Sequence, residues 1–483
     1  MDDLILGPII GGLSHERAFL WGKTEPQEGE AILHAWLGRK PDLSDAKLMG
    51  RSWPLSIEQG YAGVAPVSDL QPETTYHYHL TLSDQPPAGK SEEFASFTTF
   101  PQPGKPTSFN FAFGSCFRPE SEDGGNMFNY LEERRIFDHL RFILLLGDQV
   151  YSDDLETNSI GKIAETLEEY RKVYEYVWSR PSFRKLLTNL PAFMTLDDHE
   201  VDDDWRWLDH SRRNAYIPIW DRVLRLLVQK RPWSEGHLSY HRVQAALQAY
   251  WEHQGMHAPS LEESLEIDQS GMYKLDLDRG SLAYSFEYGS TAFFVLDTRT
   301  MRVRPRWWKF SSKRTMLGEG QWENLKNWLL KVKDTHPVKF LISSCSLFYW
   351  SILDIPRDRW SGFKEERDQL LRFIAENEIE GLYILSGDLH VAHAIHAELK
   401  APNGRLIPVW EFCSSPFEQK SSELMRRTRR EIKSDVLVRQ DLKFDIDANN
   451  FGVVCVSMKD QSEPKVSYKV FTADMRLILD TAA

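Results

Sequence analysis

Acidic, cysteine and histidine residues recur in this sequence directly after short apolar runs. The five segments are FAFGSC (111–116), ILLLGDQVY (143–151), FMTLDDHE (193–200), FFVLDTR (293–299) and LYILSGDLH (382–390). Open α/β sheets place their active sites at the carboxyl ends of the strands, so we expect these segments to converge at the edge of a single sheet. Buried carboxylates need compensating charge, which bound metal ions would supply.

The segment after the second apolar run combines a carboxylate with a phenol. Gly147 permits a sharp turn, after which Asp148 projects from the strand end and Tyr151 can point back into the same site. Carboxylate and phenolate oxygens are hard donors that suit trivalent iron. The alternative interpretation is an N-capping aspartate beside a packed tyrosine.

Two adjacent acids precede a histidine in the third segment. Asp197 and Asp198 would raise each other's pKa unless a cation or hydrogen bonds intervene, and His199 could bind a metal or donate a proton. The acids at 202–204 leave open a second interpretation, in which the segment is a solvated turn.

The first and last segments offer further metal ligands. Asp388 and His390 are two residues apart, so in extended chain both can face one site. Cys116 ends a strand inside a Gly-Ser-Cys turn, where its thiolate could join the harder ligands. Cys116 could instead be a core thiol, which is how we interpret the other three cysteines, Cys345, Cys413 and Cys455.

Arg299 closes the fourth apolar run, and two interpretations of it are open. Its guanidinium could hold a phosphate bidentately, or it could pair with one of the nearby acids. Arg304, Arg306, Trp307 and Trp308 follow it. His253 and His257 are four residues apart on an expected helix, but no third ligand accompanies them, so packing roles are favoured over zinc binding.

The elements that must position these residues fall into two regions. Residues 1–100 alternate polar and apolar residues in short runs, which predicts a small β-sandwich domain, and the proline-rich 101–107 reads as a linker. In 108–483, strands alternate with helical runs at 127–140, 163–190, 219–230, 320–333 and 364–377, which predicts a helix-covered, largely parallel sheet. Pro181 should interrupt the second helical run.

Composition narrows the function classes. The chain has 483 residues and a net charge of −13, which argues against a general nucleic-acid-binding protein. No apolar run is long enough to span a membrane, and the N-terminus has neither a signal peptide nor a twin-arginine motif, so we expect a cytoplasmic protein. The oligomeric state is not indicated by the sequence.

The five motifs, taken in order, resemble those of the alkaline phosphatase D (PhoD-like) family of calcineurin-like metallophosphoesterases, and QAYWEHQ (248–254) is similar to a helical segment of that family. This resemblance implies an α/β fold, with a calcineurin-like β-sandwich core flanked by helices and preceded by a small all-β fibronectin- or Ig-like sandwich domain. It also implies a ferric ion with a divalent metal beside it, calcium foremost and zinc or manganese as alternatives.

The resemblance also implies roles for individual residues. Cys116, Asp148, Tyr151 and His390 would surround the iron, while Asp148 would bridge to the second metal, joined by Asp198 and Asp388. His199 would lie near the leaving group, and Arg299 would contact the substrate.

The predicted function is metal-dependent hydrolysis of small phosphate esters, monoesters or diesters, by a metal-activated hydroxide. Three alternatives remain. The chain could be a phospholipase D-like phosphodiesterase, a binding protein for phosphate or carbohydrate with a decayed site, or a transferase with Cys116 as nucleophile.

Overall fold

The computed structural model describes most of the chain. The described ranges are 3–88, 94–119, 124–203, 205, 240–259, 281–302, 315–351, 359–420, 423–459, 464–474 and 477–482. The helix expected at 219–230 and the arginine- and tryptophan-rich run at 303–314 therefore lie outside the described residues.

The first hundred residues form two antiparallel sheets. One has the order β1 (Leu6–Gly11), β2 (Ala18–Lys23), β5 (Ala62–Val67), and the other has the order β4 (Lys47–Arg51), β3 (His34–Gly38), β6 (Thr75–Thr81), β7 (Ala95–Thr98). Buried and exposed side chains alternate along β6, as expected for a strand with one solvated face. The prediction of an all-β N-terminal region is confirmed. Tyr78 on β6 donates a 2.7 Å hydrogen bond to the Thr188 carbonyl, which ties this region to the rest of the chain.

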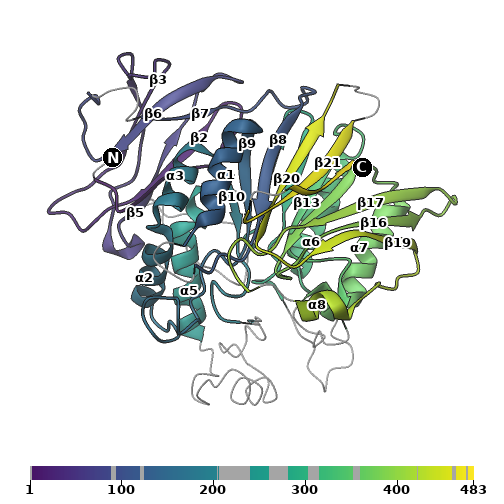
Figure 1. The fold of residues 1–483 in the computed structure, drawn as a ribbon. Coiled ribbons are helices and arrows are strands. Elements are labelled where there is room, and N and C mark those ends of the chain that lie inside the picture. The colour runs from purple at the N-terminus through teal and green to yellow at the C-terminus, as the bar shows by residue number, and fades with distance from the viewer. Residues whose placement is uncertain are drawn as a thin grey trace.

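The remainder is built on two mixed sheets (Figure 1). The six-stranded sheet has the order β10 (Ala192–Thr195), β9 (Leu140–Leu146), β8 (Phe109–Gly114), β20 (Asn450–Ser457), β21 (Lys465–Thr472), β22 (Leu477–Ala482). The seven-stranded sheet has the order β11 (Tyr284–Tyr288), β12 (Thr291–Val295), β13 (Val338–Cys345), β15 (Leu382–Gly387), β17 (Leu406–Cys413), β16 (Ala392–Lys400), β19 (Leu437–Ile446). A short pair joins β14 (Trp350–Ser351) to β18 (Arg429–Arg430).

Pairing is parallel in the part of each sheet that carries the motifs. Strands β8, β9 and β10 run parallel in one sheet, and β12, β13, β15 and β17 run parallel in the other. The edges added by β20, β21 and β16 are antiparallel. The antiparallel pair expected near the C-terminus is β20 with β21.

Aromatic side chains fill the space between the two sheets. Phe111 on β8 stacks on Phe142 with ring centroids 4.9 Å apart, and it meets Phe340 of the other sheet edge to face at 5.2 Å. The expectation of a single converging sheet is therefore wrong, since three motifs end strands of one sheet and two end strands of the other. Strand ends can be located from local sequence, but the partner of each strand cannot.

Helices cover the outer faces of this sandwich. The six-stranded sheet packs against α1 (Asn126–Phe137), α2 (Leu167–Trp178), α3 (Pro181–Asn189) and α5 (Tyr240–His253), and the seven-stranded sheet against α6 (Gly318–Val332) and α7 (Lys364–Glu376). The remaining helical elements are α8 (Glu423–Thr428), η1 (Ile57–Gln59), η5 (Gly255–His257) and η6 (Trp360–Phe363).

Local signals explain where the second helical run begins and divides. Thr166 and Glu169 form a capping box that starts α2. Pro181 then occupies the first turn of α3, where its missing N–H costs nothing, so the predicted interruption is confirmed. No helix among the described residues combines the length and the apolar character needed to cross a bilayer.

Candidate functional site

The predicted metal ligands and His199 lie in the turns that follow four strands. Cys116 follows β8, Asp148 and Tyr151 follow β9, Asp198 and His199 follow β10, and Asp388 and His390 follow β15. Short polar bonds join these turns. The Cys116 amide donates to the Gly147 carbonyl at 3.3 Å, and the Asp388 amide donates to Ser115 Oγ at 3.1 Å, which bridges the two sheets.

Glycine is required at position 147. Its φ is +96°, and a Cβ there would lie 2.5 Å from the Cβ of Asp197. The turn after β9 can therefore approach the turn after β10 only because residue 147 lacks a side chain. This close approach brings the side chain of Asp148 next to those of Asp198 and His199.

Four predicted ligands are linked by short contacts that centre on Asp148 and Tyr151. Asp148 Oδ2 lies 3.3 Å from Cys116 Sγ and 3.4 Å from the Tyr151 hydroxyl, which in turn lies 3.5 Å from His390 Nε2. Donor atoms bound to a single ion at roughly 2.0–2.3 Å are separated from one another by roughly 3–3.7 Å. Each of these three distances therefore lies in the range expected for two ligands of one metal ion.

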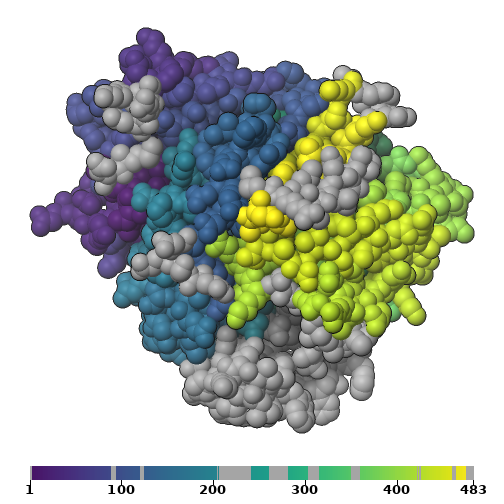
Figure 2. All heavy atoms as spheres, viewed as in Figure 1, coloured from purple at the N-terminus to yellow at the C-terminus, as the bar shows by residue number. Residues whose placement is uncertain are grey.

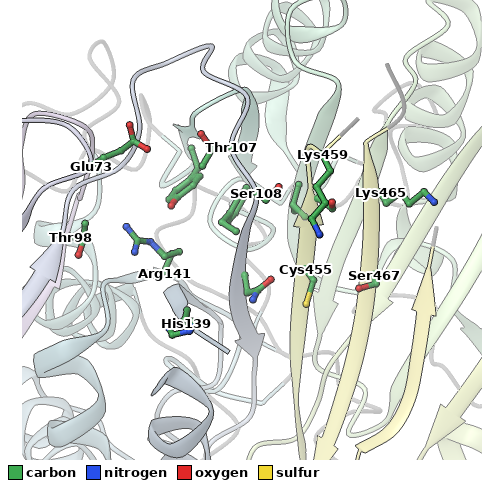
Figure 3. A pocket seen from close by; sticks show the side chains of 15 residues that line it. Glu73, Thr98, Thr107, Ser108, His139, Arg141, Cys455, Lys459, Lys465 and Ser467 are labelled. Atoms are coloured by element: carbon green, nitrogen blue, oxygen red, sulfur yellow. The ribbon is translucent and has the colours of Figure 1, made fainter. Parts of the chain in front are cut away.

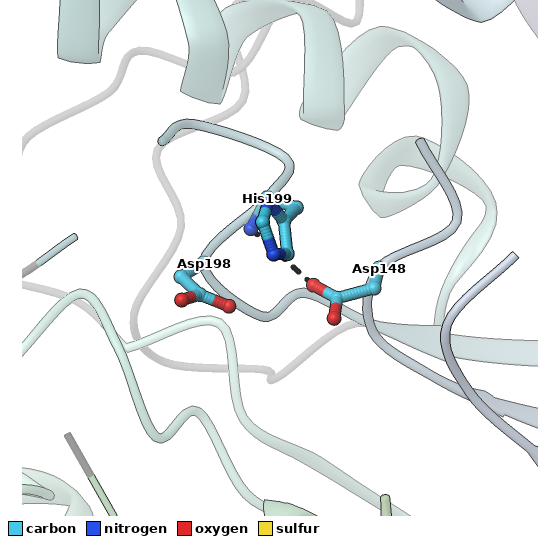
Figure 4. Close-up of side chains that lie close together, drawn as sticks. All are labelled: Asp148, Asp198 and His199. Atoms are coloured by element: carbon cyan, nitrogen blue, oxygen red, sulfur yellow. Dashed lines mark hydrogen bonds between the residues drawn. The ribbon is translucent and has the colours of Figure 1, made fainter. Parts of the chain in front are cut away.

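A second group shares Asp148 with the first. Donor atoms of Asp148, Asp198 and His199 all lie within 4.8 Å of one another. Figure 4 shows the two carboxylates on either side of the His199 ring, and the His199 amide donates to Asp148 Oδ1 at 3.3 Å. Asp148 thus presents one oxygen to Cys116 and Tyr151 while its other oxygen faces the turn after β10.

The electrostatics of this group call for a cation. Burial, aided by Asp388, raises the pKa of Cys116 to about 12. Burial and then the charge of Cys116 hold the pKa of Asp148 well above its ordinary value, and the pKa of Tyr151 is raised for the same two reasons. A metal ion would reverse each of these shifts, because it stabilises thiolate, carboxylate and phenolate. Burial lowers the pKa of His390 to about 3, which keeps it neutral and able to ligate.

The backbone at this site is held in an unusual conformation. Cys116, Asp148, Asp388 and His390 have φ values of 62°, 55°, 68° and 52°, in the left-handed region that residues with a Cβ rarely occupy. Such a conformation costs about 1–3 kcal/mol per residue and persists only where the surroundings enforce it. Four predicted ligands have this left-handed conformation, so the fold accepts a backbone cost at each position that holds one of these side chains.

His199 is held by a buried acid that the sequence analysis did not select. His199 Nδ1 lies 2.8 Å from Asp153 Oδ1, Asp153 is fully buried, and its other oxygen accepts the Asp203 amide at 3.1 Å. Burial alone would lower the pKa of His199, but the nearby carboxylates, Asp153 foremost, raise it well above its ordinary value. The His199 ring also packs on Tyr151 at 4.1 Å. Asp153 lies only five residues after Asp148, which was the available signal.

Glu200 has a positioning role that was also missed. Its buried carboxylate accepts the amides of Asp148 at 3.0 Å, Gln149 at 2.8 Å and Asp197 at 2.8 Å, together with Gln254 Nε2 from the end of α5 at 3.2 Å. One side chain thereby fixes the turns after β9 and β10 relative to each other. The glutamate that ends the Asp-Asp-His-Glu motif is thus part of the scaffold.

Arg299 is completely buried and lies among acids. Its Nε donates to Asp197 Oδ1, which also accepts Ser344 Oγ at 2.7 Å, and its Nη2 lies 3.5 Å from Asp198 Oδ1. This is the pairing alternative raised by the sequence. A role of Arg299 in substrate binding stays a prediction.

A second arginine lies nearer the surface. Arg359 contacts both oxygens of Asp388, through Nε and, at 3.3 Å, through Nη2. Its guanidinium lies over the Tyr349 ring at 6.0 Å, and its side chain is 14% exposed, whereas that of Arg299 is 0% exposed. The carboxylate of Asp388 therefore faces a guanidinium in this structure.

The remaining candidates are structural. His253 Nδ1 contacts the Ala249 carbonyl and His257 Nε2 the His253 carbonyl, both at 2.8 Å, and both rings are buried, in agreement with the packing roles expected for them. Cys345 and Cys413 are buried core thiols, and Cys455 is partly exposed.

Comparisons with known proteins agree with this geometry. A family model described as PhoD-like phosphatase matches residues 111–465. Alkaline phosphatase D of Bacillus subtilis (strain 168) is 23% identical over 368 residues, which cover 70% of this chain and 55% of that protein. The chain thus matches little more than half the length of this curated relative.

Solved structures show the same architecture. A structure of PhoD superposes with a TM-score of 0.71 at 17% identity, covering 99% of this chain and 92% of that one. Purple acid phosphatase PPD1 from yellow lupin (Lupinus luteus) seeds superposes with a TM-score of 0.58 at 11% identity, covering 98% of this chain and 73% of that one. The predicted calcineurin-like fold is confirmed, and the chain belongs to the PhoD-like phosphatase family.

Proposed function

We propose that this protein hydrolyses small phosphate esters in a metal-dependent reaction. The observation that carries the proposal is the run of short contacts that links Cys116, Asp148, Tyr151 and His390, with Asp148 shared by a second group that holds Asp198 and His199. Two ions bridged by a carboxylate are the arrangement that phosphatases and nucleases use for in-line displacement at phosphorus. Family membership supports the same reaction class.

The donor sets favour different metals at the two positions. Thiolate and phenolate beside a carboxylate and an imidazole suit ferric iron, held by Cys116, Asp148, Tyr151 and His390. The second position, with Asp148 and Asp198, offers oxygen donors and suits a divalent ion, calcium foremost and zinc or manganese as alternatives. Bound there, the cations supply Lewis-acid polarisation of the phosphoryl group and a lowered pKa for the attacking water.

We propose that His199 donates a proton to the leaving oxygen. Its Nδ1 is fixed by Asp153 at 2.8 Å, so Nε2 is the nitrogen directed away from that carboxylate. The carboxylate also stabilises the protonated ring, which is the form a general acid requires. Asp153 thus acts as a positioning residue through His199.

Arg359 is a better candidate than Arg299 for a phosphate contact. The buried Arg299 pairs with Asp197 and Asp198. If its side chain turned toward a substrate, these two buried carboxylates would lose the positive charge that compensates them. Arg359 is partly exposed and forms a two-nitrogen contact with Asp388, the geometry with which guanidinium also binds phosphate. If Asp388 joins the second metal, Arg359 is released toward the substrate.

The alternatives have less support. The run with Trp307 and Trp308, which favoured a phospholipase D-like enzyme, lies outside the described residues. Cys116 is fully buried with a raised pKa, which disfavours it as a nucleophile. A decayed binding site would be expected to have lost a ligand, whereas the six predicted metal ligands are present in the sequence.

The test combines metal analysis with kinetics. Freshly purified protein should contain iron and a second metal, show a broad visible band from tyrosinate bound to iron, and hydrolyse p-nitrophenyl phosphate or bis(p-nitrophenyl) phosphate. Tyr151→Phe should lose the band, whereas Tyr130→Phe on α1 should keep it. Protein that stays metal-free and inactive after reconstitution with iron and calcium would refute the proposal.

A further inference from the structure

A cavity of about 660 Å³ opens at the end of the sandwich opposite the candidate metal centre. Its walls come from the N-terminal region, the linker, and the six-stranded sheet, where His139 and Arg141 lie at the start of β9 (Figure 3). The same strand ends next to Asp148. At about 3.3 Å per residue, the distance from Ser108 to Cys116 along β8 is roughly 25 Å, so the cavity is separate from the metal centre.

The sheet face that lines this cavity is polar. Cys455 pairs with Ser467 and Ser457 with Lys465 across β20 and β21, and Asn110 on β8 pairs with Cys455. Further along, the same face of the sheet is apolar and packs against helices. Antiparallel pairs such as β20 with β21 commonly leave one face in water, so this polar stretch is open to a ligand.

The charges around the cavity are predominantly positive. Arg141, Lys459 and Lys465 line it, and the single acidic residue of the lining, Glu73, is already paired with Lys105. Burial raises the pKa of the Tyr288 phenol, and the nearby Arg141 guanidinium counteracts that rise. This local excess of cations contrasts with the net charge of −13 of the whole chain.

Hydroxyl groups add hydrogen-bonding capacity to the same volume. The lining includes the hydroxyls of Thr98, Thr107, Ser108, Ser457 and Ser467. Ser108 Oγ accepts the Met458 amide at 2.8 Å, which leaves its own hydrogen free to donate. Cations with hydroxyl donors are the groups with which proteins bind phosphate oxygens.

We infer that this cavity is a second binding site, for an extended polyanion of the oligophosphate class. Figure 3 shows the charged ends spread along the cavity, with Arg141 beside the N-terminal region and Lys465 on the opposite side. A single compact anion would reach one of these cations, whereas a chain of linked phosphates can contact all three. The inference does not depend on the proposed hydrolytic function, because the two sites share no residue.

Cys455 provides a local reporter for this site. It lines the cavity and is partly exposed, whereas the other three cysteines are buried. Tripolyphosphate added to the unmodified full chain should slow alkylation of Cys455 by iodoacetamide, followed by peptide mass spectrometry. Sodium chloride at matched ionic strength controls for general screening.

Variants assign the effect to the cavity. In Lys459→Ser/Lys465→Ser, the tripolyphosphate concentration that gives half-protection should rise at least tenfold, and Arg141→Gln should raise it as well. The pair Lys326→Ser/Lys331→Ser on α6 removes the same charge elsewhere and should leave it unchanged. Protection that is absent, that salt reproduces, or that both lysine pairs lose equally would overturn the inference.

Discussion

Replacing Glu200 with glutamine tests whether a single carboxylate fixes the site. In Glu200, Oε2 accepts the amides of Asp148 and Asp197, and Oε1 accepts the Gln149 amide and the Gln254 side chain. Glutamine turns one of these oxygens into an NH2 group. If the NH2 group takes the place of Oε1, the Gln254 amide can turn its unpaired oxygen toward it, and only the buried Gln149 N–H loses its acceptor. If it takes the place of Oε2, the amides of both Asp148 and Asp197 lose theirs, so the first orientation is favoured.

The magnitude follows from the one acceptor that is lost in the favoured orientation. A buried donor left unsatisfied costs about 1–3 kcal/mol, so we expect Glu200→Gln to destabilise the fold by about 1–3 kcal/mol. The Asp148 turn would also shift away from Asp198, and we expect metal affinity to fall together with stability.

Urea unfolding of the metal-free protein, followed by tryptophan fluorescence, measures the scaffold effect separately from metal binding. Glu156→Gln is the control, because the Glu156 side chain is 84% exposed and its substitution should not move the midpoint. An unchanged midpoint in Glu200→Gln would refute the reasoning, since it would mean that the carboxylate's contacts with the turns contribute no stability.

Three further changes are predicted. Asp153→Asn should lower kcat about a hundredfold with metal content unchanged, because His199 loses the carboxylate that orients it; elemental analysis beside steady-state kinetics checks this, and loss of metal would contradict it. Arg359→Ala should raise KM at least tenfold with a smaller change in kcat; kinetics unchanged in both parameters would exclude a phosphate contact. Burial lowers the pKa of Lys339 from 10.5 to about 8, so this charge costs stability below pH 8, and the cost fades as the pH rises to about 10.5. Lys339→Met should therefore stabilise the protein by about 2 kcal/mol at pH 7 and by little at pH 10.5, measured by urea unfolding at both pH values; equal gains would contradict the assignment.

The parts of the site that could be predicted depend on short stretches of neighbouring residues in the sequence. An apolar run followed by glycine and an acid identifies a strand end, so Cys116, Asp148 and His390 could be selected before their contacts were known. Family resemblance then added the order of the motifs. The helix boundaries at Pro181 and the capping box of α2 are local signals of the same kind.

The parts that the sequence did not predict depend on contacts between distant segments. The five motifs are divided between two sheets, and this division depends on how the inner faces of the sheets pack. Phe111 and Phe340, for example, meet across the two sheets although they are more than 200 residues apart in the sequence. Glu200 and Arg359 have roles defined by their partners, Asp148 and Asp388, and no spacing rule indicates those partners. The complete burial of Arg299 could likewise not be predicted, which is why the sequence left two interpretations of this residue open.

The left-handed backbone at Cys116, Asp148, Asp388 and His390 has a consequence for how these positions tolerate substitution. Each residue carries a backbone cost of about 1–3 kcal/mol that the surrounding structure must offset. Stability and function therefore make opposite demands at these positions. Glycine at any of these four positions would relieve the strain but would also remove the ligating side chain, so the fold would gain stability while the site lost a metal ligand.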